Sequence, residues 1–218
     1  MALADSAPDF DRPPPPGYRE RAGVFALTAD GQGVLVITSR SDAGPRGGGG
    51  QAISPERYIL PAGGVEPGES REQAAWREAL EEAGALVTIL APLVRHCPEP
   101  QSAVGKPTAA EGVKREARRL SVTYWYRARI ERLVDAAGGE WPEASLRRRA
   151  LISLGDGDDA TAPSRLQRAL SWRPDATAAL QAYLAWRMTP PTVPNGDIRE
   201  VDTTSKGDEG ESRRAGST

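Results

Sequence analysis

Short apolar and β-branched runs along the chain alternate with stretches rich in glycine, proline and charge. The runs AGVFALTAD (22–30) and GVLVITS (33–39) predict two strands that form a hairpin around Gly31-Gln32. The same composition predicts further strands at RYILP (57–61), LVTILAPLVRH (86–96), LSVTYWYRARI (120–130) and RALISL (149–154).

Helical patterns are interleaved with these strands. Between Ser70 and Ala83 a helix is predicted, because Ser70 and Gln73 have the spacing of a capping box and Gly84 stands where a helix ends. Two more helices are predicted at 162–172 and 174–188, the second with an apolar face of Leu180, Tyr183, Leu184 and Met188. Strands interleaved with helices indicate the α/β class, as a mixed β-sheet sandwiched between helices.

Proline and glycine define the expected domain limits. Four consecutive prolines (13–16) predict that residues 1–16 are a disordered leader, and the prolines and polar residues of 189–218 predict a disordered tail. Residues 17–188 are then one domain, within which the glycine-rich segment 41–56 is expected to be a flexible insertion.

Composition narrows the setting of the protein. With Cys97 as its one cysteine and no apolar run near the roughly 20 residues that span a bilayer, the chain is expected to be a cytoplasmic protein without membrane contact, nuclear access being left open. Residues 95–149 contain 12 basic and 7 acidic residues, and this local excess favours an anionic ligand. A monomer is the expected state, and nucleic acid is not an expected partner.

The segment GGVEPGESREQAAWREALEEAG (63–84) contains the most informative group of side chains. On a helix, Glu78, Glu81 and Glu82 project from nearly one face, where like charges destabilise the helix by about 0.2–0.5 kcal/mol per pair. The cluster is compatible with an ordinary solvated face, but it is also the oxygen-ligand set that Mg²⁺ prefers, with Mn²⁺ as the other candidate cation. Arg77 has the spacing to pair with Glu81 or Glu69.

The full spacing of this segment resembles the signature of the Nudix hydrolases. Gly63, Glu69, Arg77-Glu78, Glu81-Glu82 and Gly84 match the Nudix box at every non-hydrophobic position, whereas Ala79 and Ala85 replace larger aliphatic residues. The resemblance implies an enzyme of the Nudix fold that hydrolyses a P–O–P linkage with Mg²⁺. It assigns metal binding to Glu78, Glu82 and the Gly63 carbonyl, a further ligand or the general base to Glu81, and support to Glu69 and Arg77.

A narrower resemblance concerns the substrate. GYRERAG (17–23), ERYILPAGGVEPGES (56–70) and EWPEASLRRRALISL (140–154) resemble the diphosphoinositol polyphosphate and diadenosine polyphosphate phosphohydrolases, particularly the fungal type. This resemblance implies a polyphosphorylated small-molecule substrate. Substrate contacts are then expected at Arg19, Arg21, Ser39, Arg40, Arg147 and, in the C-terminal helix, Arg173. Arg115, in the basic segment KREARR (114–119), is a further expected contact. Glu20, at a position that is basic in those enzymes, and Ala62 depart from their pattern.

Other readings stay open. Nudix enzymes also act on ADP-ribose, dinucleotide cofactors, oxidised nucleotides or capped RNA, and Tyr124, Trp125 and Tyr126 could stack a base, although alternating strand aromatics are more often core. From another class, the chain could bind an inositol pyrophosphate as a sensor without turnover. His96 and Cys97 provide no tetrahedral ligand set, so a metal site there is not expected.

Overall fold

The computed structural model describes residues 9–39, 57–99, 120–136, 139–155 and 164–188. In chain order its elements are β1 (Arg19–Leu27), β2 (Gly33–Ile37), β3 (Ala62–Gly64), α2 (Arg71–Ala83), β4 (Ala85–His96), β5 (Ser121–Leu133), β6 (Arg149–Ser153), α3 (Arg165–Leu170) and α4 (Pro174–Met188). The predicted helices and all but one of the predicted strands are present, with ends that differ by a few residues.

A mixed sheet forms the centre of the molecule, in the order β4-β5-β1-β2-β6. The pair β1–β5 is parallel, whereas β2 is antiparallel to both β1 and β6. The short strand β3 pairs antiparallel with the first half of β1, where Arg21 is opposite Gly64 and Ala22 is opposite Gly63. This pairing brings the glycines beside the start of β1.

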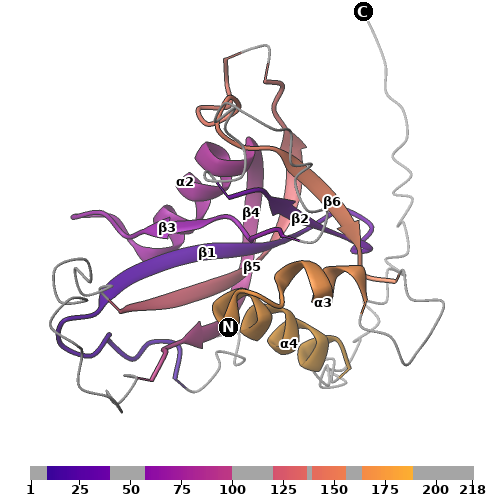
Figure 1. Cartoon of the computed structure of the whole chain (residues 1–218). Coiled ribbons are helices and arrows are strands. Elements are labelled where there is room, and N and C mark those ends of the chain that lie inside the picture. Colours follow the sequence, from indigo (N-terminus) through magenta and orange to yellow (C-terminus); the bar gives the residue numbers. More distant parts are fainter. Residues whose placement is uncertain (1–8, 40–56, 100–119, 137–138, 156–163, 189–218) are drawn as a thin grey trace, which may run out of the picture.

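Both faces of the sheet are covered, as Figure 1 shows: α2 lies on one side and α3 and α4 lie on the other. Successive residues of β1 divide between two cores, as the period of a strand requires. Val24 packs in the cluster that contains the alanines of α2, and Phe25 packs in the cluster that contains Leu166 and Tyr183. The predicted α/β sandwich is therefore confirmed.

The ends of α2 follow from local sequence. The Ser70 side chain accepts a hydrogen bond from the Gln73 backbone N–H, and the Gln73 side chain accepts one from the Ser70 backbone N–H. Gly84 ends the helix at φ 57°, a left-handed conformation that glycine adopts without steric cost. The capping box and the terminating glycine are confirmed.

Two secondary-structure predictions were wrong. Residues 57–61 form no strand but a single bridge, in which the backbone N–H and C=O of Ile59 bond to those of Ile37 before the chain turns at Pro61. Met188 does not share the buried face of α4, because it lies at the end of the helix with 84% of its surface exposed. Leu180 and Tyr183 do lie on that face.

The expected leader needs a correction at residues 9–16, because this segment packs on the sheet. Phe10 is buried, and its ring makes edge contacts with Tyr124 and Tyr126 at centroid distances of 5.5 and 5.1 Å. The Tyr124 hydroxyl donates to the Arg12 carbonyl at 2.7 Å. The buried Phe10 side chain and these backbone contacts hold a proline-rich segment whose composition indicated disorder.

Other expectations fall outside the described residues. These are the leader up to residue 8, the insertion at 41–56 and the tail at 189–218. Within the described part of the chain, no helix combines the length and the apolarity needed to cross a bilayer.

The packing of Phe10 predicts that Phe10→Ala lowers the free energy of unfolding by about 3–5 kcal/mol, since a buried aromatic side chain is lost from the core. Urea denaturation of the full chain measures this difference. Asp11→Ala is the control, because Asp11 is exposed in the same segment. An unchanged stability in Phe10→Ala would show that residues 9–16 contribute nothing to the domain.

Candidate active site

The buried face of α2 contains carboxylates among small residues. Its buried positions recur every three to four residues and comprise Ala74, Ala75, Glu78, Ala79, Glu82 and Ala83. Alanine at these positions lets the helix approach the sheet closely, which brings Glu78 and Glu82 against β3. Glu81 points away from this contact, and 39% of its side chain is exposed.

Arg77 joins three carboxylates, those of Glu69, Glu78 and Glu81. Its Nη2 and Nε donate to Glu69 Oε1 and Oε2 at 2.8 and 3.2 Å, and its Nη1 donates to Glu78 and Glu81 at 2.9 and 3.1 Å. A further bond from Nη2 reaches the Gly64 carbonyl at 2.8 Å. The predicted pairing of Arg77 with Glu69 and Glu81 is therefore present, and a planar guanidinium is the group that can serve so many acceptors at once.

Gly63 faces the Glu78 carboxylate directly. A Cβ atom at this position would overlap all three atoms of that carboxylate, whereas a Cβ atom at Gly64 would meet nothing within 4 Å. Two adjacent glycines thus differ sharply in what they allow. Gly63 is required because the β3 backbone and the buried Glu78 occupy neighbouring space.

Glu82 is held from two sides. The Ala62 backbone N–H donates to its Oε2 at 2.9 Å, and Arg147 Nη2 donates to its Oε1. Arg147 also donates from Nε to Glu143 Oε2 at 2.6 Å and from Nη1 to the Thr38 carbonyl at 3.0 Å. Only 5% of the Arg147 side chain is exposed. The expectation that Arg147 contacts substrate phosphates is therefore corrected: its guanidinium is buried and bonded within the protein.

Burial dominates the electrostatics of the inner carboxylates. Loss of solvent raises the pKa of both Glu78 and Glu82, although Arg77 and Arg147 act in the opposite direction. The charge of Glu78 further raises the pKa of Glu82, and the charge of Glu81 further raises the pKa of Glu78, because like charges lie close together. The pKa of Glu69 is lowered by its hydrogen bonds from Arg77. Arg77 and Arg147 thus offset only part of the cost of burying the negative charges of Glu78 and Glu82 beside β3.

These carboxylates fit a hard divalent cation by their chemistry. Oxygen donors from Glu78, Glu81 and Glu82, together with the backbone beside Gly63, are of the type that Mg²⁺ and Mn²⁺ accept. Within the described residues, no three acidic, histidine or cysteine side chains are already gathered closely enough to hold an ion. Arg77 and Arg147 donate hydrogen bonds to oxygens of these carboxylates.

The residues expected to contact phosphates are only partly brought together. Arg19 is exposed at the start of β1, and Arg21 Nη2 donates to the Ala62 carbonyl at 2.6 Å while its Nε has no hydrogen-bond partner in the described structure. Ser39 lies partly buried directly after β2. Arg173 forms a bidentate pair with Asp175, at 3.0 and 2.8 Å. The remaining two, Arg40 and Arg115, lie outside the described residues.

The aromatic run of β5 belongs to the core. At most 4% of the surface of Tyr124, Trp125 or Tyr126 is exposed, so none of the three is available to stack a base. At the end of β4, burial lowers the pKa of His96. That His96 and Cys97 form no metal site stays a prediction.

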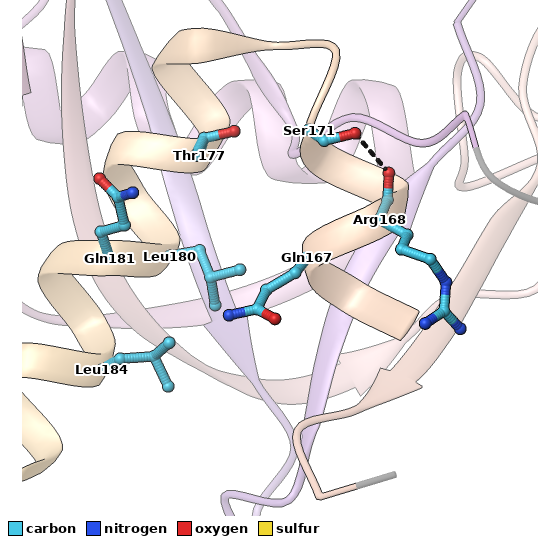
Figure 2. A pocket seen from close by; sticks show the side chains of 7 residues that line it. All are labelled: Gln167, Arg168, Ser171, Thr177, Leu180, Gln181 and Leu184. Atoms are coloured by element: carbon cyan, nitrogen blue, oxygen red, sulfur yellow. Dashed lines mark hydrogen bonds between the residues drawn. The ribbon is translucent and has the colours of Figure 1, made fainter. Parts of the chain in front are cut away.

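A surface pocket of about 600 Å³ lies elsewhere, between α3 and α4 (Figure 2). Its lining side chains are Gln167, Arg168, Ser171, Thr177, Leu180, Gln181 and Leu184. None of these comes from α2 or β3, so this pocket is separate from the glutamates.

Sequence reasoning missed several residues that shape the site. Glu143 is buried against Arg147, and its backbone N–H donates to the Glu81 carbonyl at 3.1 Å. Arg149 donates to the carbonyls of Ala83 and Gly84 at 3.0 and 3.1 Å, so it caps the end of α2. The spacing of Glu143 and Arg147, four residues apart, was the one local signal for this pair.

Fold and site together define an α/β protein in which an acidic helix packs against a glycine-containing strand. Arginines donate hydrogen bonds to the glutamates of this helix. The model of the NUDIX domain family matches residues 17–153, and the chain belongs to this family.

Individual relatives match over a shorter region. The chain is 37% identical over 67 residues to an RNA pyrophosphohydrolase of Rhodospirillum rubrum, a match that covers 31% of this chain and 33% of that protein. It is 33% identical over 70 residues to diphosphoinositol polyphosphate phosphohydrolase 3-alpha of Mus musculus, covering 32% and 36%. The chain therefore matches about a third of the length of these curated relatives.

Solved structures are also similar. A NUDIX hydrolase from Nitrosomonas europaea aligns at a TM-score of 0.49 with 20% identity, over 77% of this chain and 89% of that one. An Ap4A hydrolase from C. elegans aligns at a TM-score of 0.44 with 17% identity, over 78% and 98%.

The two glycines of β3 provide a matched test of the site geometry. Gly63→Ala is expected to lower the free energy of unfolding by about 1–3 kcal/mol, because the added methyl group displaces the buried Glu78 carboxylate. Gly64→Ala should change it by less than about 0.5 kcal/mol. Chemical denaturation measures both, and the cost of Gly63→Ala should largely disappear in a Glu78→Ala background. Equal effects of the two alanines would contradict the contact.

Proposed function

We propose that the chain is a pyrophosphohydrolase that cleaves a P–O–P linkage in a polyphosphorylated small molecule, with Mg²⁺ or Mn²⁺ as cofactor. The observation that carries this proposal is the placement of Glu78 and Glu82, which are buried against β3 with raised pKa values. A structural core rarely contains two adjacent carboxylates whose ionisation is disfavoured, and such groups often mark a functional site.

Glu78 and Glu82, with the Gly63 carbonyl, are the proposed ligands. A divalent cation bound there would neutralise charge on the substrate phosphates and lower the pKa of a water molecule. Glu69 and Arg77 then orient the carboxylates, as their direct contacts indicate. The cation also offsets the repulsion that the carboxylates exert on one another.

Glu81 is the proposed general base. Its side chain is more exposed than those of Glu69, Glu78 and Glu82. Arg77 donates a hydrogen bond to its Oε2. A general base must reach a water molecule and accept its proton while the water oxygen attacks phosphorus. A buried carboxylate such as Glu82, which accepts hydrogen bonds on both oxygens, does this less readily. The proton passes to the Glu81 carboxylate while the P–O–P bond breaks and the leaving phosphate carries away the bridging oxygen.

Diphosphoinositol polyphosphates and diadenosine polyphosphates are the proposed substrates. Support comes from the sequence motifs and from the similarity to diphosphoinositol polyphosphate phosphohydrolase 3-alpha. Arg19 and Arg21, at the strand beside Gly63 and Gly64, are the described arginines best placed for phosphate oxygens. Similarity to an RNA pyrophosphohydrolase makes the 5′ end of RNA the second candidate substrate.

The substrate is tested by incubating the chain with a diphosphoinositol polyphosphate, diadenosine hexaphosphate, ADP-ribose and 5′-triphosphorylated RNA, each with and without Mg²⁺. Glu82→Gln should reduce turnover by more than about 100-fold, because a metal ligand is lost. Glu72→Gln is the control, since Glu72 is an exposed acidic residue of the same helix. Hydrolysis confined to ADP-ribose or RNA would overturn the substrate proposal, and Mg²⁺-independent turnover would overturn the role of the metal.

A second prediction separates the base from the ligands. Glu81→Gln is expected to lower kcat by about 10²–10⁴-fold, the usual contribution of a general base. Calorimetric titration of Mg²⁺ should show a smaller loss of affinity in Glu81→Gln than in Glu82→Gln. If Glu81→Gln instead abolishes Mg²⁺ binding and leaves turnover at saturating metal intact, Glu81 is a ligand and not the base.

A further inference from the structure

Arg147 is bonded to three separate parts of the fold. Its guanidinium reaches Glu82 on α2, Glu143 in the turn after β5 and the Thr38 carbonyl at the end of β2. Burial of the side chain leaves it little contact with solvent, so these bonds are screened weakly. Such a residue fixes the relative positions of the elements that it joins.

The consequence for Glu82 is a fixed carboxylate. One oxygen accepts from the Ala62 backbone N–H and the other accepts from Arg147, so β3 and the turn hold it from two directions. Glu82 itself is buried with an exposed fraction of 6%. Each oxygen keeps a second lone pair, which leaves the carboxylate able to bind a cation in this orientation.

Glu143 keeps Arg147 in place. The turn that contains both residues is closed by backbone bonds from Leu146 and Arg147 to the Glu143 carbonyl, at 2.8 and 3.0 Å. The Glu143 backbone N–H is bonded to the Glu81 carbonyl, so the turn is also attached to α2 beside Glu82. The Arg147 guanidinium is thus placed by a rigid segment that is itself docked on the metal-binding helix.

We propose that Arg147, with Glu143, is a positioning residue that orients Glu82 for the divalent cation. This inference rests on the proposed function of Glu82. Arg147 holds Glu82, whereas Arg77 holds Glu78 and Glu81. A lysine could supply the charge of Arg147 but not its planar arrangement of donors to three acceptors.

Two effects of removing Arg147 have opposite signs. Loss of a positive charge alone would strengthen binding of a cation, whereas loss of orientation weakens it. The proposal predicts that orientation dominates, with a decrease of about 10–100-fold in Mg²⁺ affinity, as is usual when a group that supports a metal ligand is lost. The sign of the change therefore distinguishes positioning from a simple charge effect.

The test is calorimetric titration of Mg²⁺, and separately Mn²⁺, into the full chain without substrate, so the result does not depend on turnover. Arg147→Met should bind Mg²⁺ about 10–100-fold more weakly than the unsubstituted chain. Arg148→Met is the matched control, because it removes the same charge one residue away from an exposed side chain. It should leave the affinity unchanged.

Arg147→Lys and Glu143→Gln guard against loss of folding in Arg147→Met. Both should fold, as circular dichroism would show, and both should weaken Mg²⁺ binding. Unchanged or tighter binding in the folded variants would overturn the inference while leaving the proposed function intact. If the unsubstituted chain binds neither Mg²⁺ nor Mn²⁺, the proposed function itself fails, and this result is obtained before any substitution is made.

Discussion

The arrangement of the site depends on two carboxylates, Glu78 and Glu82, that are buried against the sheet. Burial disfavours the charged forms of Glu78 and Glu82, and the fold offsets this with hydrogen bonds from Arg77, Arg147 and the Ala62 backbone N–H. A half-satisfied buried charge is costly, so each of these donors has a structural purpose as well as a chemical one. The same arrangement keeps the carboxylates close together without cancelling their charge completely, which is the condition for attracting a cation.

The remainder of the fold positions those donors. Pairing of β3 with β1 brings Ala62 and Gly63 to the helix, and the absence of a side chain at Gly63 makes room for Glu78. Small alanines on α2 let the helix sit close to this strand. At the C-terminal end of α2, Arg149 donates hydrogen bonds to the carbonyls of Ala83 and Gly84. Its guanidinium packs over Trp141, 4.6 Å from the ring centre. The turn before β6 and the first residue of β6 therefore stabilise the proposed ligand Glu82 and the helix that bears it.

Local patterns were readable from the sequence, and distant pairs were not. The helix limits, the glutamate face and the pairing of Arg77 with Glu69 follow from spacings of a few residues. In contrast, Arg147 and Glu82 are separated by 65 positions, and nothing in a basic triplet shows that its first member is buried in an ion pair. The burial of Phe10 was also missed, because a single aromatic residue in a proline-rich segment forms no periodic pattern. The substrate and the metal stay predictions, since the structure describes only the protein.

The contacts that Arg147 and Arg149 make within the protein change where a substrate can be recognised. The basic excess of residues 95–149 indicated an anionic ligand, but in the structure both arginines bond to groups of the protein itself. Net charge in a sequence counts such buried guanidiniums together with exposed ones, although only the exposed ones remain available to a ligand. Arg21 is only partly buried, although its Nη2 also donates to the Ala62 carbonyl. It lies opposite Gly64 on β1, and its charge acts on Glu78 and Glu82. A phosphate bound at the start of β1, as proposed, would lie next to the proposed metal ligands, at the same end of the sheet.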